Sequence, residues 1–400
     1  MSSARVHDID LLTPPVAQTI QRRSLIIGVA FAILSLIGLF VSPGGQFMRS
    51  YLLGFMAWLG LSLGCMALLM TQYLTGGKWG FVIRRILEAG MNCLPLMALL
   101  FIPLIVGVHQ LYDWAKPEKV SATHELQEIT KSFLNQTGYA LRGIVFLVIW
   151  LGMAYLLTKW SRQQDEPPVR DFSPLYKRLS APGLIVYAFT ISFAAIDWVM
   201  SLDARWISTI YPLIFVAGQL LLAMCFVVVV EAILSRYLPY SEILKPSELH
   251  DHGNLMLTFT MLWAYFSFSQ LLIIWSGNLP DEIVWYYRRW FGGWQYFGIG
   301  LALFHFAVPF ALLLSRHRKR HVARLVKVAI FLIIMRFADL LWFIEPNLHK
   351  QLFVHWLDIV IPVAMGGLWF ALFFYNLKRR ALLPIYDPMT KPALEEPSHA

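Results

Sequence analysis

Titratable side chains recur inside long apolar stretches of this sequence, and they are the residues whose types could do chemistry. An ionised group buried in hydrocarbon is costly, so each such residue is a candidate for function. The candidates in the second half of the chain are Asp197, Ser201, Asp203, Glu231, His250, Asp251, Tyr265, Ser269, His305, Arg336, Asp339, Glu345 and Asp358. Acids and histidines staggered in depth, with hydroxyl groups and water between them, are typical of proton relays. The pattern therefore predicts a proton path.

Most of these residues also have a structural interpretation. Arg336 and Asp339 are three residues apart, so they can form an ion pair on one helical face. His305 is compatible with a hydrogen-bonded core position. The acids that interfacial water could solvate are Asp203, Glu345 and Asp358. Asp197 has no local partner and is followed four residues later by Ser201, so it has the strongest functional interpretation.

The stretch from Glu248 to Glu282 combines several candidates on one predicted helix. Its uncharged part, Asn254 to Trp275, is long enough to cross a bilayer. The polar residues that share one face of this helix are Asn254, Thr258, Tyr265 and Ser269. Because unpartnered polar groups are costly in hydrocarbon, we expect this face to meet protein or water. The alternative is that the hydroxyl groups bond to the preceding turn and the tyrosine packs.

The composition assigns the chain to the membrane. Of its 400 residues 58% are hydrophobic and only 14% are charged, whereas soluble domains carry about 25% charged residues. About ten apolar segments are long enough to span a bilayer: 25–41, 51–74, 88–111, 139–159, 184–202, 208–235, 254–275, 294–315, 322–345 and 356–377. We therefore predict an all-α integral membrane protein with about ten transmembrane helices.

Lys and Arg concentrate in alternate loops, which predicts that both termini are cytoplasmic. The net charge of +9 follows from this topology, and no basic soluble face suggests nucleic acid. Within the outer loop, residues 121–134 are amphipathic and predict a short surface helix. The predicted segments are a cytoplasmic arm (1–24), helices 1–4 (25–159) with an outer loop (112–138), a proline-rich cytoplasmic linker (160–183), helices 5–10 (184–377) and a cytoplasmic tail (378–400).

The residues that commonly hold cofactors are scattered. The cysteines lie singly in apolar segments and include no paired motif: Cys65, Cys93 and Cys225. The histidines in or beside spans fall at different depths, which disfavours a haem between two of them: His109, His305 and His355. We expect this chain to bind no metal or cofactor directly.

Two blocks of sequence resemble a known family. The first contains Asp251-x-Gly253-x-Leu255, Trp263-Ala264-Tyr265-x-x-Phe268-Ser269-Gln270 and Ile274-Trp275-x-Gly277-Asn278-Leu279-Pro280-x-Glu282. The second contains Asp197-Trp198-Val199-Met200-Ser201-Leu202, then Trp206-x-Ser208-Thr209-x-Tyr211. With the ten-span layout, they resemble the F subunit of bacterial alternative complex III, a quinol:electron-acceptor oxidoreductase, over nearly the whole chain. The sequence departs from the family pattern at Asn254, where a lysine is expected.

The resemblance implies a fold related to the membrane subunit of polysulfide reductase, with two four-helix bundles (spans two to five and six to nine) plus flanking helices. It implies a non-redox subunit in the bacterial inner (cytoplasmic) membrane that serves respiratory or photosynthetic electron transfer. Haem c, iron–sulfur clusters and quinol would belong to its partners. These would be a sister quinol-binding C subunit, an iron–sulfur B subunit, multihaem and monohaem cytochrome c subunits, small membrane subunits and lipid. The implied role is a proton path or its support.

Three other functions are compatible with the sequence. A quinone site could form at Asp197 or His305 with neighbouring aromatic side chains, because apolar pockets with few polar groups suit a quinone. A secondary transporter would need broken helices, for which Pro309 and Pro362 are mild indications. The chain could also be a purely structural anchor.

Overall fold

The computed structural model describes residues 14–42, 45–122, 124–166, 170–384 and 387. Most of the predicted cytoplasmic arm (1–24) and tail (378–400) lies outside these residues. Every regular element in the described part is a helix. The elements that form spans are α2 (Pro15–Val41), α3 (Gln46–Thr75), α4 (Lys78–Met91), α5 (Leu94–Val106), α9 (Gln136–Gln164), α10 (Ser173–Trp198), α11 (Tyr211–Leu234), α13 (Pro246–Gly277), α15 (Trp294–Leu301), η3 (Ala302–Ala307), α16 (Val308–Leu314), α18 (Val322–Ile344) and α19 (Leu357–Leu377).

Short elements connect the spans at their ends. They are α6 (Val108–Leu111), η1 (Asp113–Ala115), α7 (Pro117–Ala122), α8 (His124–Ser132), η2 (Met200–Leu202), α12 (Tyr240–Ile243), α14 (Pro280–Arg289), α17 (Arg316–Lys319) and η4 (Glu345–Asn347). α8 confirms the predicted surface helix, and its Leu126 is buried while its charged residues are exposed or half-buried.

Nine helices in the described residues are long and apolar enough to cross a membrane, so the protein is an all-α, multi-pass membrane protein as predicted. Two predicted spans are interrupted helices: α4 with α5, and α15 with η3 and α16. The remaining predicted span is α18, which has 23 residues. It has more charges than a typical span because it carries Arg324, Lys327, Arg336 and Asp339.

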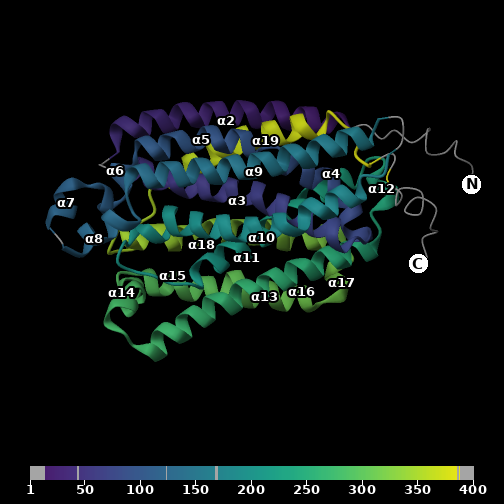
Figure 1. The fold of residues 1–400 in the computed structure, drawn as a ribbon. Coiled ribbons are helices and arrows are strands. Elements are labelled where there is room, and N and C mark those ends of the chain that lie inside the picture. Colours follow the sequence, from purple (N-terminus) through teal and green to yellow (C-terminus); the bar gives the residue numbers. More distant parts are fainter. Residues whose placement is uncertain (1–13, 43–44, 123, 167–169, 385–386, 388–400) are drawn as a thin grey trace, which may run out of the picture.

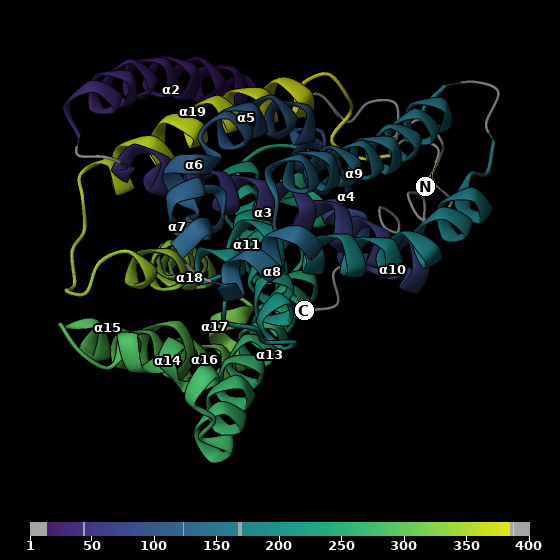
Figure 2. The same ribbon diagram turned by 60° about the vertical axis from the view of Figure 1, so that its left-hand side comes forward.

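The helices run roughly parallel, and their connections gather at two ends (Figure 1). One end holds α4, α12 and α17, and the other holds α6, α7, α8 and α14. We call the first the inner end and the second the outer end, following the distribution of Lys and Arg. Figure 2 shows α2 beside α19 at one edge and α13 to α16 at the opposite edge.

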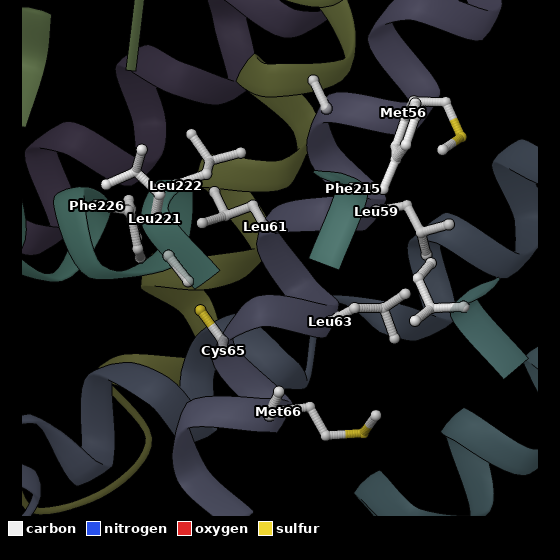
Figure 3. Close-up of a cluster of buried hydrophobic side chains, with 14 of the residues drawn as sticks. Met56, Leu59, Leu61, Leu63, Cys65, Met66, Phe215, Leu221, Leu222 and Phe226 are labelled. Carbon is white, nitrogen blue, oxygen red and sulfur yellow. The ribbon is translucent and has the colours of Figure 1, made fainter. Parts of the chain in front are cut away.

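α3 is the central helix of the molecule. Its most apolar stretch is 94% buried, and it packs against α4, α10, α11 and α19. Apolar side chains from α3 and α11 interdigitate along this contact, including Leu61, Cys65 and Phe226 (Figure 3). A Cβ atom at Gly64 would lie 2.3 Å from the carbonyl oxygen of Gln219, so only glycine permits this approach of the two helices.

The predicted linker over 160–183 is mostly helical, so that prediction was wrong. α9 continues to Gln164 and α10 begins at Ser173. Pro174 falls in the first turn of α10, where a backbone N–H would have no partner within the helix. Pro182 lies inside α10, which transmembrane helices tolerate. Pro174 and Pro182 therefore lie within a helix and do not mark the loop.

Candidate functional site

Asp197, the strongest candidate, is paired with a residue that the sequence analysis missed. Arg142 of α9 donates from Nε to Asp197 Oδ2 at 2.7 Å and from Nη2 to Oδ1 at 2.9 Å. Ser201 Oγ donates to the backbone oxygen of Asp197 rather than to its carboxylate. Asp197 therefore has no partner on its own helix, as predicted, but its carboxylate is paired with an arginine from another helix. The signal was Arg142 itself, an arginine inside an apolar segment.

Asp203 is also paired. It follows η2 at the outer end and accepts a hydrogen bond from Arg288 of α14 at 2.7 Å. Both residues line an outer cavity of about 540 Å³ that also contains Arg205, His349 and Lys350. Asp203 is buried, yet this cavity gives its partner access to solvent. The pair therefore belongs to the outer surface and not to an internal route.

A central cluster forms from Trp263, His305, Arg336 and Asp339. Arg336 and Asp339 form the ion pair that their spacing allowed, and both are buried. Trp263 of α13 donates from Nε1 to Asp339 Oδ2 at 3.1 Å. The Trp263 and His305 rings meet edge to face, with centroids 4.1 Å apart. Three separate segments, α13, η3 and α18, therefore bring these side chains together.

Two members of the central cluster have polar atoms that no described residue partners. His305 is fully buried, and within the described residues neither ring nitrogen has a hydrogen-bond partner. Asp339 Oδ1 likewise has none in the same part of the chain. Buried polar atoms are nearly always hydrogen-bonded, so water or a ligand is the expected partner. His305 lies in a π-helical turn, a feature often found at functional sites, and is not the satisfied core histidine considered above.

A cavity of about 490 Å³ adjoins the central cluster. Helices α13, α14, α15 and α18 contribute most of its lining, and Asp339 and Trp263 form part of its wall. The other polar side chains on its wall are Tyr265, Ser267, Gln270 and Tyr286. Ser267 Oγ has no hydrogen-bond partner among the described residues. The cavity is otherwise apolar and aromatic.

An inner pair joins Glu231 of α11 to His252 of α13, and both side chains are fully buried. His252 Nδ1 lies 2.9 Å from Glu231 Oε2, and Nε2 donates to the carbonyl oxygen of Trp79 at 2.9 Å. Because a carbonyl oxygen only accepts, Nε2 carries a hydrogen. A single proton can therefore be shared between Nδ1 and the carboxylate. Glu231 Oε1 is unpartnered within the residues described.

The buried titratable residue of α13 in this pair is His252, and not one of the two predicted candidates, His250 and Asp251. Asp251 is exposed, and His250 contacts Asn254 and lies 3.8 Å from Asp251. Each residue advances a helix by about 100°, so one step along α13 decides which of these side chains faces α11. The spacing from His252 to the buried Met256 and Trp263 was the available signal.

The predicted polar face of α13 is only partly covered by the described residues of this chain. Tyr265 is 65% exposed, Thr258 is exposed, and Ser269 is half-buried. Thr258 Oγ1 donates to the backbone oxygen of Asn254 at 2.9 Å, as the alternative interpretation required. Asn254 Oδ1 accepts a hydrogen bond from Lys319 Nζ at 2.6 Å. The polar side chains that α13 buries are instead Glu248, His252, Thr260 and Gln270.

Glu345 is the most isolated acid of an outer group. It is 1% exposed, and neither carboxylate oxygen has a hydrogen-bond partner in the described chain. The nearest ionic contact is His349 Nε2, 3.6 Å from Oε2. Burial, followed by repulsion from Asp358, raises the pKa of Glu345 to about 8. Glu345 is therefore predominantly protonated at neutral pH.

Asp358, in contrast, accepts several hydrogen bonds from protein groups. It accepts hydrogen bonds from Ser50 Oγ, from Gln46 Nε2 at 3.3 Å and from the backbone N–H of His355 at 2.8 Å. Gln46 also contacts His349 through Oε1 at 3.1 Å. Hydrogen bonds therefore connect four residues of this outer group: Gln46, Ser50, His349 and Asp358. The fifth member, Glu345, takes no part in them among the described residues.

A further inner cluster is built around Glu88 of α4. Arg85 donates to Glu88 Oε2 at 2.7 Å, Arg84 to Oε1 at 3.2 Å, and Arg380 to Oε2 at 2.9 Å. Arg380 and Arg85 also reach Asp165 at the end of α9. The three guanidinium groups and their acids join the segment after α19 to α4 and α9. Arg84 also donates to Asp387 Oδ2 at 2.6 Å, so three acids match the three arginines and the cluster is structural.

Three levels of buried titratable groups therefore exist: the inner pair, the central cluster and the outer group. In the part of the chain that the structure describes, no hydrogen bond between side chains joins one level to the next. A proton could pass between levels only through water. The protein is thus an all-α, multi-pass membrane protein with titratable groups at three depths. No protein-family model matches its sequence, and no curated protein matches it either.

Proposed function

We propose that this chain is a non-redox, cofactor-free subunit of a quinol:electron-acceptor oxidoreductase resembling alternative complex III, in the bacterial inner membrane. Its partners there would be the quinol-binding C subunit, the iron–sulfur B subunit, the cytochrome c subunits and small membrane subunits. These would hold the quinol, the iron–sulfur clusters and haem c. The proposal rests on the sequence resemblance to this family. The chain's own contribution is to hold and pass protons through the bundle of α11, α13, η3 and α18.

One observation supports proton transfer: both nitrogens of His305 and Oδ1 of Asp339 have no hydrogen-bond partner among the described residues, and both side chains contact Trp263. An imidazole can accept a proton on one nitrogen and release it from the other. The Glu231–His252 pair can exchange a proton at the inner end, and Glu345 can hold one at the outer end. Asp197 and Asp203 have bonded arginine partners, so their role is support.

The test is proton movement by the assembled complex in proteoliposomes. His305→Phe keeps the ring contact with Trp263 but removes both nitrogens. We expect it to lower the number of protons moved per electron while quinol oxidation and assembly persist. Asp203→Asn, at the outer surface, is the control and should leave this ratio unchanged. If the ratio of protons to electrons were unchanged in both His305→Phe and Asp339→Asn, the chain would be only a structural scaffold. If the chain purified without haem proteins, it would instead be a transporter.

A second candidate is a quinone site in the 490 Å³ cavity beside Asp339. Its wall is mostly apolar with a few polar groups, which is the character of quinone pockets; the polar groups are Tyr265, Ser267, Gln270 and Tyr286. Ser267→Phe would fill part of the cavity. If a quinone binds here, a photoreactive quinone should label wild-type α13 and lose that labelling in Ser267→Phe. Labelling confined to partner subunits would exclude this candidate.

A further inference from the structure

The inner ends of α16, α17 and α18 carry positive charge that the proposed proton path does not use. The basic residues there are Arg316, His317, Arg318, Lys319, Arg320, His321, Arg324 and Lys327. The sequence has no carboxylate between Glu282 and Asp339. Among the described residues, none of these basic side chains forms an ion pair with an acid. Lys319 instead donates to the neutral amide of Asn254.

Part of this surface encloses a cavity of about 550 Å³ between α16, α17 and α18. The cationic part of its wall consists of His317, Arg318, Arg324 and Lys327. The apolar part consists of Val308, Leu312, Val328 and Phe331. Ser315 completes the lining, which includes no acid among the residues described. The cavity is therefore cationic on one side and apolar on the other.

The two parts of the wall are arranged along the helix axes. On α18, Arg324 and Lys327 precede Val328 and Phe331, so the cations lie nearer the inner end and the apolar groups lie deeper. On α16 the apolar Val308 is likewise the deeper residue, with α17 following at the inner end. The polarity thus changes from charged to apolar in the direction in which a membrane changes from headgroup to hydrocarbon.

Apolar side chains continue this surface toward the middle of the spans. Phe304 of η3 contacts Phe331 edge to face, with ring centroids 6.4 Å apart. On α18, the exposed Ile334 lies about one turn deeper than Phe331. An acyl chain that left the cavity could follow this surface without meeting a polar group.

No acid among the described residues forms an ion pair with the cations of the cavity wall. Arg324 lowers the pKa of His317, and Arg318 and His321 act in the same direction. An anion in the cavity would relieve this repulsion. Arginine matches a phosphate group with two parallel hydrogen bonds, and lysine adds a point charge.

We propose that this cavity binds an anionic membrane phospholipid, with the phosphate group against Arg318, Arg324 and Lys327 and an acyl chain on the apolar wall. Basic pockets between transmembrane helices at the cytoplasmic side are suited to such headgroups. The apolar wall favours a lipid over a free anion, because phosphate alone would use only the cationic side.

The test uses the complex reconstituted in nanodiscs of phosphatidylcholine with a minor fraction of phosphatidylglycerol. Native mass spectrometry then counts the phosphatidylglycerol that the protein retains. The triple substitution Arg318→Gln, Arg324→Gln and Lys327→Gln should weaken retention about tenfold or more, since each cation near the lipid contributes. The control removes three exposed cations from the inner ends of α9 and α10: Lys159→Gln, Lys177→Gln and Arg178→Gln. The proposal would be overturned if both variants lost the same amount of phosphatidylglycerol, or if neither variant lost any.

A second variant separates a lipid from a free anion and does not depend on removing charge. Leu312→Trp fills the apolar side of the cavity and keeps every cation. We expect it to lower retention of phosphatidylglycerol about fivefold or more, because the acyl chain loses its place. If Leu312→Trp retained the lipid as the wild type does, or if inorganic phosphate displaced the lipid at similar concentration, the site would be a plain anion site and the proposal would fail.

Discussion

Arg142 on α9 donates two hydrogen bonds to the carboxylate of Asp197 on α10, at 2.7 and 2.9 Å. Asp197 is completely buried, whereas the arginine is partly exposed and also lies over the Phe133 ring at 4.0 Å. A bidentate pair of this kind fixes two helices in register as well as neutralising the acid. Asp197 was the strongest candidate for proton transfer in the sequence. It instead has a structural role, which depends on a residue of another helix.

Removing Arg142 should destabilise the protein strongly. Arg142→Met leaves the Asp197 carboxylate buried without its partner, which costs about 3–5 kcal/mol. Thermal unfolding in detergent, followed by tryptophan fluorescence, measures this loss. The double variant Arg142→Met/Asp197→Asn removes the uncompensated charge, so it should recover part of the stability. A single variant as stable as wild type would show that the pair does not hold α9 to α10.

Glu345 should make stability depend on pH. Its pKa is raised from 4.5 to about 8, so the folded protein binds a proton that the unfolded chain releases. The stability contributed by this bound proton is present in full at low pH and is lost as pH rises from about 4.5 to about 8. Glu345→Gln should therefore gain stability relative to wild type across this window and keep that gain above it.

Melting temperatures of wild type and Glu345→Gln at a series of pH values measure this effect. The control is Glu128→Gln in α8, because Glu128 is largely exposed on the outer surface. A constant difference between Glu345→Gln and wild type across the window would contradict the raised pKa. Infrared spectroscopy supplies a second readout, since wild type at neutral pH should show a protonated carboxyl band that Glu345→Gln lacks.

Glu88 should hold the segment after α19 in place. Glu88→Gln leaves Arg84, Arg85 and Arg380 with one carboxylate fewer, and breaking a buried ionic network costs about 3–5 kcal/mol. We expect faster tryptic cleavage after Arg380, because its contact with Glu88 is lost. Glu118→Gln on the exposed α7 is the control. Unchanged cleavage would mean that Asp165 and Ser161 suffice to anchor this arginine.

Gly64 should be intolerant of any side chain. The Cβ of Gly64→Ala would lie 2.3 Å from the Gln219 carbonyl oxygen on α11, so the helices must separate. Such overpacking typically costs about 1–3 kcal/mol. The matched control is Gly152→Ala, where nothing lies within 4 Å of the added atom, and this variant should be neutral or slightly stabilised. Equal unfolding temperatures for the two variants would contradict the close packing of α3 on α11.

The sequence was sufficient for features that depend on neighbours along the chain. Length and apolarity of a segment decide whether it can span a membrane, so the spans and the helical class were predictable. Arg336 and Asp339 are three residues apart on one helix, so their ion pair was predictable too. The sequence also showed that α18 carries more charge than the other spans. It did not show that α18 packs against α11.

The tertiary structure decided which face of each apolar helix is inside. In a membrane protein both the core and the lipid are apolar, so hydropathy carries little information about rotation. For this reason the sequence favoured Tyr265 and His250, whereas the structure buries Trp263 and His252. Pairing across helices, such as Arg142 with Asp197, likewise required the fold, because the contact joins residues on different elements. Sequence determined which residues are costly to bury, and only packing determined how each is compensated.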